Sequence, residues 1–287
     1  MLRTSQSRVK GMSVNRLIED RFGLESEIGR SIDDNGTLGG ILARRSCRTF
    51  SGDEVPRDLL DTLLAAAFSA PSKSDLQQAC VIHVNDRDRQ RRIAGMKDST
   101  RWVADAPLLL VWCGDSRRIR RLAEWRGHAF ANDHLDAFMN AAVDAGICMQ
   151  TFIVAAESVG LGCCPISEIR DHIEPLSAEL GLPQHVFPVA GLAVGWPRGD
   201  RRLSLRLPMS VTVHEDRYDD SGLFEIVAEY DRRREALEQT PPQRQRLIDE
   251  FGVASDYGWS ENRTRQYSQP ARADFGRYIR KQGFDLD

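Results

Sequence analysis

Hydrophobic residues follow two patterns along the chain, short continuous runs and long helical stretches, and each pattern predicts a different kind of element. Short apolar runs at residues 80–84, 107–113 and 187–194 predict strands. The last two runs are apolar throughout, as is typical of strands covered on both faces. Residues 134–162 predict one long helix that ends at a glycine-rich stop. Because its apolar residues go almost all the way round, this helix is either the core helix or part of a subunit interface.

Shorter helices are predicted on both sides of this centre. The pattern indicates helices near residues 14–21, 38–45 and 223–238, and another that begins at Pro56. Helix and strand signals mix without a regular β-α-β rhythm. This favours an α+β fold over a doubly wound parallel sheet.

The polarity of the chain changes twice and predicts three segments. Residues 1–37 are polar and are expected to form an N-terminal arm. Residues 38–215 hold the apolar runs and are expected to form the core. Residues 216–287 are polar again, with a charged helix followed by a long tail. The tail has few core-like residues of its own, so we expect it to wrap a neighbouring subunit.

Composition excludes several classes of protein. With 287 residues, 41% of them hydrophobic, the chain can build a sizeable core. A net charge of −3 predicts no nucleic-acid partner and no acidic membrane surface. The first twenty residues lack the apolar stretch of a signal peptide. The most apolar region, residues 137–161, carries Asp144, Gln150 and Glu157 and is too polar for a membrane span, so we expect a soluble protein.

The cysteines and histidines indicate neither disulfides nor a metal site. None of the six cysteines belongs to a C-x-x-C pair, which predicts reduced thiols in a cytoplasmic protein. We interpret the adjacent Cys163 and Cys164 as packing residues rather than a redox pair. The six histidines lack the spacing of metal ligands. The chain also has no G-x-S-x-G, Walker A or G-x-G-x-x-G motif.

A basic segment at residues 43–50 is the first candidate for binding chemistry. Three guanidinium groups and a hydroxyl stand within five residues at the end of a predicted helix, on Arg44, Arg45, Ser46 and Arg48. Such a group can surround a phosphate, because arginine makes two charge-assisted hydrogen bonds to neighbouring oxygens. Taken alone, the same composition also suits a solvated basic face.

Three further segments are weak candidates when each is taken alone. Residues 70–77 offer small hydroxyl side chains after a proline, suited to a flat heteroaromatic ring or to a plain loop. Residues 160–168 are glycine-rich and then extended, suited to presenting backbone N–H groups or to an ordinary helix stop. Residues 201–208 form a second basic cluster.

These four segments, in this order, resemble the nitroreductase family of flavoproteins. Residues 44–50 (RRSCRTF) look like the opening R-x-S-x-R/K-x-F signature, and 70–77 (APSKSDLQ) like A-P-S-x-x-N-x-Q. Residues 155–162 (AAESVGLG) are close to A-A-E-S-L-G-L-G. Features from residue 182 to the C-terminus resemble the oxygen-insensitive, NADPH-preferring nitroreductase and flavin reductase P subgroup. The match runs from about residue 38 to the end of the chain.

The resemblance implies a central, mostly antiparallel sheet flanked by helices. It also implies an intertwined homodimer with an extended C-terminal tail and two FMN sites at the subunit interface. Arg44, Arg45, Ser46 and Arg206 would hold the FMN phosphate, and Arg48 would lie near the pyrimidine edge. The remaining positions implied are Ser72, Lys73, Ser74 and Asp75 in the ring-binding loop, Ser167 and Glu168 near flavin N5, and Arg272 in the substrate cavity.

The implied activity is an NAD(P)H oxidoreductase that reduces nitroaromatics or quinones by ping-pong transfer of two electrons. The bound FMN carries the chemistry, so no side chain is expected to act as a nucleophile. One alternative is a flavin reductase that supplies reduced flavin to a partner monooxygenase. Another is a reductase specialised for one metabolite, and a third is a flavin-binding protein without turnover.

Five positions depart from the family pattern. Asp75 stands where the family has asparagine, and its carboxylate can accept a hydrogen bond from flavin N3–H but cannot donate one. Glu168 stands where a glycine is usual and would narrow access to the ring. Ser204 replaces a lysine. Glu250 and Ser255 replace arginines that grip the 2′-phosphate of NADPH, which leaves the choice between NADPH and NADH open.

Overall fold

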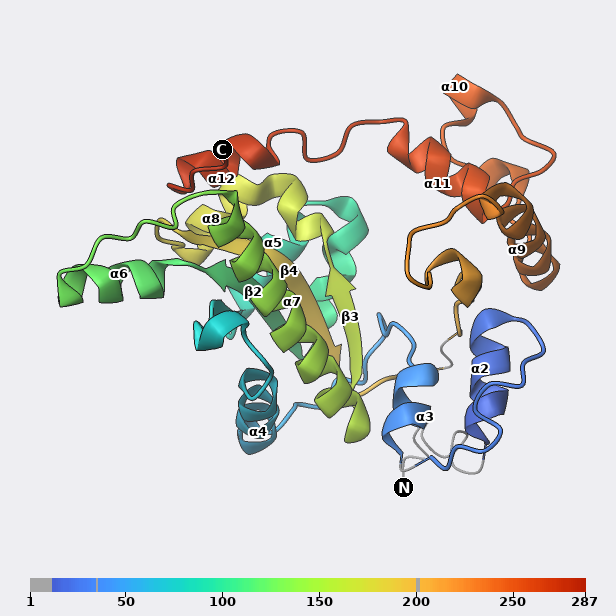
Figure 1. The fold of residues 1–287 in the computed structure, drawn as a ribbon, viewed down its shortest axis with the longest axis horizontal. Helices are drawn as coiled ribbons and strands as arrows, with labels where there is room; N and C mark the ends of the chain where they lie inside the picture. The colour runs from blue at the N-terminus through green and yellow to red at the C-terminus, as the bar shows by residue number, and fades with distance from the viewer. Residues whose placement is uncertain (1–11, 35, 200–201) are drawn as a thin grey trace. The chain divides into compact units, whose positions relative to one another are not determined.

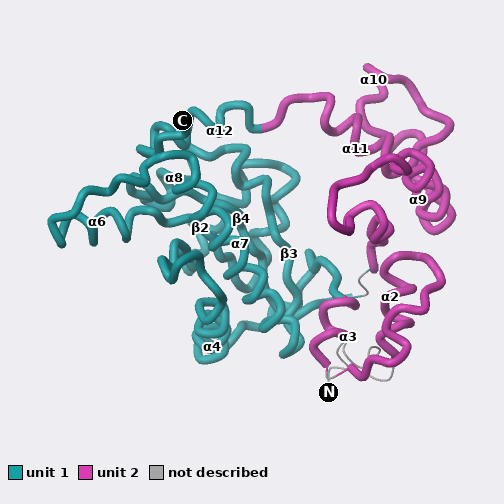
Figure 2. The backbone as a smooth tube through the Cα atoms, viewed as in Figure 1, with its two compact units in different colours: residues 1–10, 44–202, 272–287 teal, residues 11–43, 203–271 magenta. Residues whose placement is uncertain are grey.

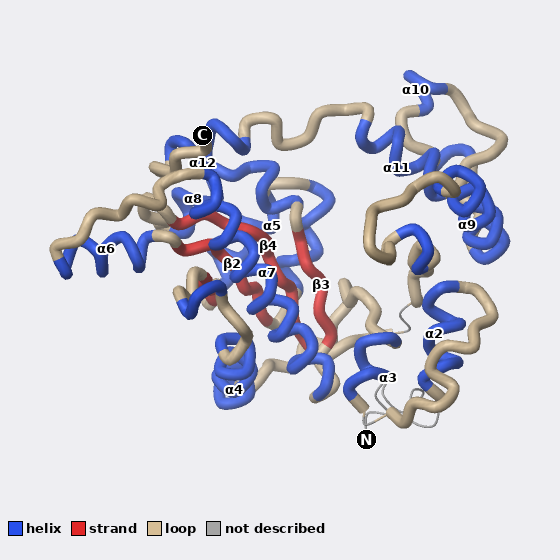
Figure 3. Tube along the Cα trace, viewed as in Figure 1, coloured by secondary structure: helices blue, strands red, loops and turns tan. Residues whose placement is uncertain are grey.

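A four-stranded antiparallel sheet forms the centre of the fold (Figures 1 and 3). The computed structural model describes residues 12–34, 36–199 and 202–287. The strands are β1 (Ala79–His83), β2 (Leu108–Asp115), β3 (Gly162–Ile166) and β4 (Val186–Gly195), in the order β1-β2-β4-β3. All neighbours run antiparallel, so the predicted α+β fold is confirmed. The three predicted strands are present, and the segment expected to be extended after residue 162 is the fourth.

Both faces of the sheet are covered, as the unbroken apolar runs predicted. Every residue of β2 is buried. Alternate residues point to opposite faces of a strand. Leu110 and Trp112 therefore join one core cluster with α4 (Arg57–Phe68) and α7 (Leu135–Ser158). Leu109 and Val111 join the other cluster with α5 (Arg87–Gly95), η2 (Asp98–Asp105) and α8 (Ile173–Leu180).

The long helix α7 is shorter at its C-terminal end than the sequence indicated. The predicted helix ran to Gly162, whereas α7 ends at Ser158. Gly160 turns the chain with a left-handed φ of 94°, a conformation that costs glycine little, and Gly162 then begins β3. Among the described residues, α7 alone is long and apolar enough to cross a membrane by length and composition. Here it packs on the sheet through Phe152 and Ile153, which are fully buried.

One face of α7 stays uncovered by the described part of the chain. Leu135, Met139 and Val143 follow one another at four-residue spacing, which places them on the same side of the helix. Their exposed fractions are 50%, 59% and 48%. An apolar stripe of this kind suits a protein interface, in agreement with the second of the two roles predicted for this helix.

The chain divides into two compact units (Figure 2). Unit 1 contains residues 44–202 and 272–287 and holds the sheet. It also contains η1 (Lys73–Asp75), α6 (Arg117–Arg126), η3 (Glu168–His172) and α12 (Phe275–Lys281). The C-terminal end was expected to have few core residues, yet Tyr278, Ile279 and Phe284 are buried and pack with Phe187 of β4.

Unit 2 contains residues 11–43 and 203–271, and the elements of its described part are all helical. They are α2 (Val14–Phe22), α3 (Thr37–Leu42), η4 (Met209–Val211), α9 (Leu223–Leu237), η5 (Pro242–Arg244), α10 (Ile248–Phe251) and α11 (Trp259–Tyr267). Polar contacts help to hold this unit together. The buried Arg265 donates hydrogen bonds to the carbonyl oxygens of Arg246 and Gly252. On α9, the buried Asp231 accepts hydrogen bonds from Ser260.

Candidate functional site

The basic segment predicted to bind phosphate lies alongside β3 in unit 1. Helix α3 was expected to reach residue 45 but ends at Leu42, and the chain beyond it has no helical structure where it passes β3. The Cys47 N–H donates to the carbonyl oxygen of Cys163 at 3.0 Å. Further along, the Ser51 N–H donates to the carbonyl oxygen of Trp196 at 2.8 Å. The first and third candidate segments are therefore neighbours in space.

Charged side chains of this segment lie near the start of β3, where Arg44 and Arg48 are close to Cys164. The Arg44 Nε lies 3.6 Å from Oε1 of Glu157, at the end of α7. Arg44 and Arg45 are half-buried, and Ser46 and Arg48 are exposed. A local cluster of guanidinium groups with an accessible hydroxyl is the donor set that a phosphate monoester requires.

The two adjacent cysteines beside these arginines have raised pKa values. Burial raises the pKa of the Cys164 thiol, against the opposing effect of the nearby Arg48 and Arg44 charges. Burial also raises the pKa of the Cys163 thiol well above its ordinary value. A thiol that stays protonated is a poor nucleophile. The interpretation of this pair as packing residues agrees with the structure.

The loop predicted to bind a flat ring is held by a carboxylate on α7. Asp144, 1% exposed, accepts hydrogen bonds from the Ser72 hydroxyl at 2.8 Å and the Lys73 N–H at 3.1 Å. Within the loop, the Ser74 and Asp75 backbones adopt left-handed φ values of 52° and 56°. The side chains of Lys73, Ser74 and Asp75 are exposed, so the loop presents them to solvent in a fixed backbone conformation.

The structure does not bring this loop and the basic segment together within one chain. The loop is bonded to Asp144, whereas Arg44 is paired with Glu157, thirteen residues further along the same helix. At 1.5 Å per residue the two anchor points are roughly 20 Å apart. Within unit 1 of one chain, the predicted ring-binding residues and the predicted phosphate-binding residues therefore form two separate groups.

Glu168 and Arg272, both predicted near the flavin or its substrate, belong to one network of charges. Lys97 Nζ lies 3.2 Å from Oε1 of Glu168 and also contacts Asp171 of η3. The Ser99 hydroxyl donates to Glu168 at 3.0 Å. Arg272 donates from Nη1 to Asp171 Oδ1 at 2.6 Å. Ser167 precedes Glu168 at the same corner of the fold and is exposed.

The pKa values of Asp171 and Lys97 are shifted towards the charged forms. Burial alone would raise the pKa of Asp171, but hydrogen bonds from Lys97 and Arg272 lower it below its ordinary value. The hydrogen bond to Asp171 raises the pKa of Lys97. Both groups are thus ionised at neutral pH. Arg272 itself has a left-handed φ of 56°, at the point where the chain re-enters unit 1.

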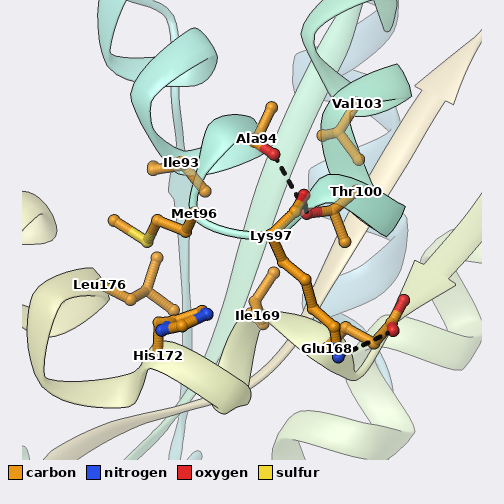
Figure 4. Close-up of a pocket in the computed structure, with 10 residues that line it drawn as sticks. All are labelled: Ile93, Ala94, Met96, Lys97, Thr100, Val103, Glu168, Ile169, His172 and Leu176. Carbon is orange, nitrogen blue, oxygen red and sulfur yellow. Dashed lines mark hydrogen bonds and ion pairs between the residues drawn. The ribbon is translucent and has the colours of Figure 1, made fainter.

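A small pocket opens beneath the Lys97–Glu168 pair (Figure 4). Figure 4 shows the two charged groups facing each other at its edge, with Met96, His172 and Leu176 on the opposite wall. Of the predicted site residues, Glu168 is the one that lines this pocket.

Arg206, the fourth predicted phosphate ligand, lies in unit 2. Its side chain is exposed, and its backbone N–H donates to the carbonyl oxygen of Arg21 at 2.9 Å. Arg21 belongs to α2, so the helix predicted near residues 14–21 fixes the backbone at Arg206.

Three residues around these groups carry roles that the sequence did not reveal. In the sequence, Asp144 is one of a few polar residues in an apolar helix, and nothing sets it apart from the others. Lys97 and Asp171 stand in ordinary charged segments. The roles of Asp144, Lys97 and Asp171 follow from tertiary contacts, and the sequence does not show which residues will be in contact.

Comparison with known sequences identifies the family. Residues 41–196 match the sequence profile described as "Nitroreductase family", and residues 204–287 match "Nitroreductase family, C-terminal domain". The chain is 32% identical over 197 residues to a protein of Salmonella typhimurium named "Oxygen-insensitive NADPH nitroreductase". That alignment covers 69% of this chain and 80% of the relative. A Bacillus subtilis relative named "FMN reductase [NAD(P)H]" is 29% identical over 257 residues, 88% of this chain and 99% of the relative.

Solved structures agree with the sequence comparison. The structure described as "Structure of B. megaterium NfrA2" is similar with a TM-score of 0.79 and 30% identity, over 88% of this chain and all of that one. "NADPH:FMN oxidoreductase from Vibrio harveyi complexed with NAD+" gives a TM-score of 0.76 and 27% identity, over 87% of this chain and 98% of that one. The resemblance seen in the motifs is therefore confirmed: the chain belongs to the nitroreductase family.

Proposed function

We propose that this protein is a homodimeric, FMN-dependent NAD(P)H oxidoreductase that reduces nitroaromatic or quinone acceptors. The observation that carries the proposal is the basic segment 44–48, held beside β3 in a nitroreductase fold. Relatives named FMN reductase, NADPH-flavin oxidoreductase and oxygen-insensitive NADPH nitroreductase support the reaction class. We place the enzyme in the cytoplasm, as expected from its reduced cysteines.

The phosphate of FMN would be held by guanidinium groups. Arg44 and Arg45 supply planar donors beside β3, and Ser46 adds an exposed hydroxyl. Arg206 is assigned to the same phosphate by its motif. Glu157 neutralises part of the charge on Arg44, and a bound phosphate would share that guanidinium.

The ring-binding loop would come from the other subunit. Ser72, Lys73, Ser74 and Asp75 lie with Asp144, roughly 20 Å along α7 from the part of the helix that pairs with Arg44. A single FMN does not span that distance between its ring and its phosphate. A second copy of the chain, packed on the exposed apolar stripe of α7, would bring its own loop to the site. The separation of the two groups along α7 supports a binding site shared between two subunits.

The remaining residues would position and tune the flavin. FMN, when bound, accepts a hydride from NAD(P)H and passes two electrons to the next ligand. Arg48 would lie near the pyrimidine edge, where its positive charge favours the reduced, anionic state. The backbone at Ser167 and Glu168 would approach N5, and Arg272 would face the substrate. Donor and acceptor would use the same cavity in turn, which gives ping-pong kinetics.

A second candidate function is release of reduced flavin to a partner monooxygenase. The relatives named FMN reductase favour it. The two functions differ in the strength of cofactor binding. A reductase of nitroaromatics or quinones retains FMN through purification and many turnovers, whereas a flavin supplier shows saturation kinetics with added free FMN.

The experiment is a visible absorption spectrum of the purified protein before and after anaerobic NADPH, and separately NADH. Flavin bands that bleach, and return when a quinone is added, are the expected result. Comparing the two rates identifies the preferred donor. Flavin bands that neither donor bleaches would support the alternative of a flavin-binding protein without turnover. A colourless protein that takes up no added FMN would overturn the proposal.

A matched pair of variants tests the phosphate ligands. Arg45→Ala is expected to weaken FMN binding about tenfold or more while leaving riboflavin, which has no phosphate, almost unchanged. Arg91→Ala on α5 is the control, because this side chain is 65% exposed and pairs with its helical neighbour Asp88. Equal loss of FMN and riboflavin in Arg45→Ala would remove that residue from the phosphate site.

A further inference from the structure

We propose that Asp144 is a positioning residue for the flavin: its buried carboxylate holds the loop 72–78 in the conformation that receives the ring. The inference rests on the proposed FMN function. It assigns a role to a residue that touches neither cofactor nor substrate, and it explains why an acidic side chain is kept inside the core helix.

Asp144 is out of place as a packing residue. It lies in the middle of α7 with 1% of its surface exposed, and its neighbours Ala141, Ala145 and Cys148 are buried core residues. A carboxylate in such a position is costly unless hydrogen bonds satisfy its oxygens. An apolar residue would fill the position at no such cost. The acidic side chain is therefore explained by what it binds.

The Asp144 carboxylate accepts its hydrogen bonds from the loop. Oδ2 accepts from the Ser72 hydroxyl at 2.8 Å and from the Gln78 N–H at 3.0 Å, and Oδ1 accepts from the Lys73 N–H at 3.1 Å. Ser72 Oγ in turn accepts from the Gln77 N–H at 2.7 Å. One carboxylate thus fixes both ends of the loop, and the serine it holds fixes a third point.

The loop needs this support because its backbone is strained. Ser74, Asp75 and Gln77 have left-handed φ values of 52°, 56° and 52°. Residues other than glycine adopt this backbone conformation at an energetic cost. Such residues cluster at ligand sites, where the surrounding structure holds the backbone in that conformation. Without the carboxylate, the loop would relax to other conformations and binding would have to restore this one.

The far side of the loop is tied to the sheet. Gln78 immediately precedes β1, and its carbonyl oxygen accepts from the Asp115 N–H at 2.9 Å. Arg118 donates to the carbonyl oxygen of Gln77. Between these fixed points, the exposed side chains of residues 73–75 project from a backbone with few remaining freedoms. Asp144 joins this arrangement to the core helix by hydrogen bonds, and an ion pair of 3.7 Å between Lys73 Nζ and Asp136 Oδ2 of α7 adds a second contact at the surface.

The test measures affinity for FMN and for riboflavin in apo-protein, by quenching of flavin fluorescence. Asp144→Asn keeps the shape of the side chain but replaces one acceptor oxygen with an NH2 donor. That donor would face the loop hydroxyl or N–H groups, which are donors themselves, so hydrogen bonds to the loop would be lost. We expect both dissociation constants to rise by the same factor, about tenfold or more, because the loop contacts the ring that the two flavins share. A defect in the phosphate site would affect FMN alone.

Two further variants separate positioning from folding. Ser72→Ala removes the serine hydrogen bonds without altering the core helix, and a several-fold loss for both flavins is expected. Gln90→Leu is the matched control: Gln90 is a buried polar residue of α5 that donates to the carbonyl oxygens of Val103 and Ala106. It should lower the unfolding temperature without changing flavin affinity.

The outcomes distinguish this inference from the proposed function. If the wild-type protein binds no FMN, the proposed function fails and the inference fails with it. If the wild-type protein binds FMN and Asp144→Asn binds the two flavins with wild-type affinity, the inference alone is overturned, whatever the affinity of Ser72→Ala. A lowered unfolding temperature with unchanged affinity would have the same meaning, since Asp144 would then be purely structural.

Discussion

Arg21 donates a hydrogen bond from Nη1 to the carbonyl oxygen of Ser204 at 3.1 Å, across 183 positions of sequence. Its Nε also donates to the carbonyl oxygen of Leu42 at 2.9 Å. The side chain is only 7% exposed. One residue of α2 thereby joins two segments of unit 2, which continue into the basic segment at Arg44 and into Arg206. The N-terminal helix thus holds these two segments of unit 2 together at Leu42 and Ser204.

Removing the hydrogen bonds of the Arg21 side chain should loosen unit 2 locally. Arg21→Met keeps the apolar stem but deprives both carbonyl oxygens of a charged donor, at a cost of about 2–3 kcal/mol. We expect hydrogen exchange of the Arg206 amide, which donates to the Arg21 carbonyl oxygen, to accelerate by a factor of about 30 to 100. The control is Arg16→Met, on the same helix, where the side chain is 63% exposed. Equal exchange rates in the two variants would show that Arg21 holds nothing in place.

The network around Asp171 predicts a pH dependence of stability. Although burial acts to raise the pKa of Asp171, the hydrogen bonds from Lys97 and Arg272 lower it in the folded state. A carboxyl pKa that is lower in the folded state adds stability. This stability is fully present above the pKa of the carboxyl in the unfolded chain, near pH 4, and is lost as the pH falls through its pKa in the folded protein. Asp171→Asn should therefore cost about 1–2 kcal/mol at pH 7, and the difference from wild type should shrink below about pH 4.

The measurement is urea unfolding of both proteins between about pH 3 and pH 7. Lys97 points to a complementary effect at alkaline pH. Its pKa is raised by the hydrogen bond to Asp171, so its stabilising effect is present at neutral pH and is lost as the pH rises through the folded value. A difference between wild type and Asp171→Asn that stays constant down to the lowest pH would mean that this ion pair does not set the titration.

Gly114 of β2 allows a close approach between the sheet and an aromatic cluster. A Cβ at this position would lie 2.5 Å from Cζ of Phe187, and 3.1 Å from the backbone carbonyl carbon of Ala141. The Phe187 ring is packed between Phe138 and Phe284, with centroids 4.7 and 5.3 Å away, and cannot move aside.

Gly114→Ala should accordingly lower the stability by about 1–3 kcal/mol, seen as a lower unfolding temperature in calorimetry. Gly95→Ala is the control. Gly95 ends α5, and outside its own helix no atom of the described residues lies within 4 Å of the position that a Cβ would take there. Alanine at that position should therefore leave stability unchanged or slightly higher. Equal unfolding temperatures in the two variants would show that the core around Phe187 yields more readily than its packing indicates.

The fold was largely predictable because its signals are local. The apolar runs of β2 and β4 and the long pattern of α7 needed no knowledge of contacts, and the absence of a β-α-β rhythm indicated the right fold class. The errors lie at boundaries, where tertiary pairing decides. The chain after Leu42 leaves the helix and passes β3, and α7 ends at Ser158 because the turn at Gly160 frees Gly162 to begin that strand.

The candidate site was less accessible from sequence. Motifs identify residues such as Arg44 and Ser72, but the roles assigned to them stay predictions. Charged residues that act through other residues are hard to identify from sequence: Asp144 is an acid in an apolar helix, and Lys97 is a lysine in a polar loop. That the two parts of the site lie apart along α7 followed only from the contacts of Asp144 and Glu157.

Asp75 provides a test of the flavin environment, since it stands where the motif expected from the family resemblance carries asparagine. Its side chain is exposed and accepts a hydrogen bond from the Gln77 amide at 3.1 Å. Near the pyrimidine edge, its negative charge would oppose formation of the reduced, anionic flavin by about 1–2 kcal/mol. Asp75→Asn should thus raise the midpoint potential of bound FMN by about 20–40 mV, since about 30 mV corresponds to about 1.4 kcal/mol for two electrons.

Affinity for FMN should persist in Asp75→Asn, because the amide oxygen still accepts a hydrogen bond from flavin N3–H. Arg48→Gln is the opposite control: on the proposed placement it would remove a positive charge from the pyrimidine edge, and it should lower the potential by a similar amount. Dye-linked titration measures both shifts. If the potential moves in Arg48→Gln but not in Asp75→Asn, then Asp75 does not face the ring, and the loop meets the flavin through Lys73 and Ser74 instead.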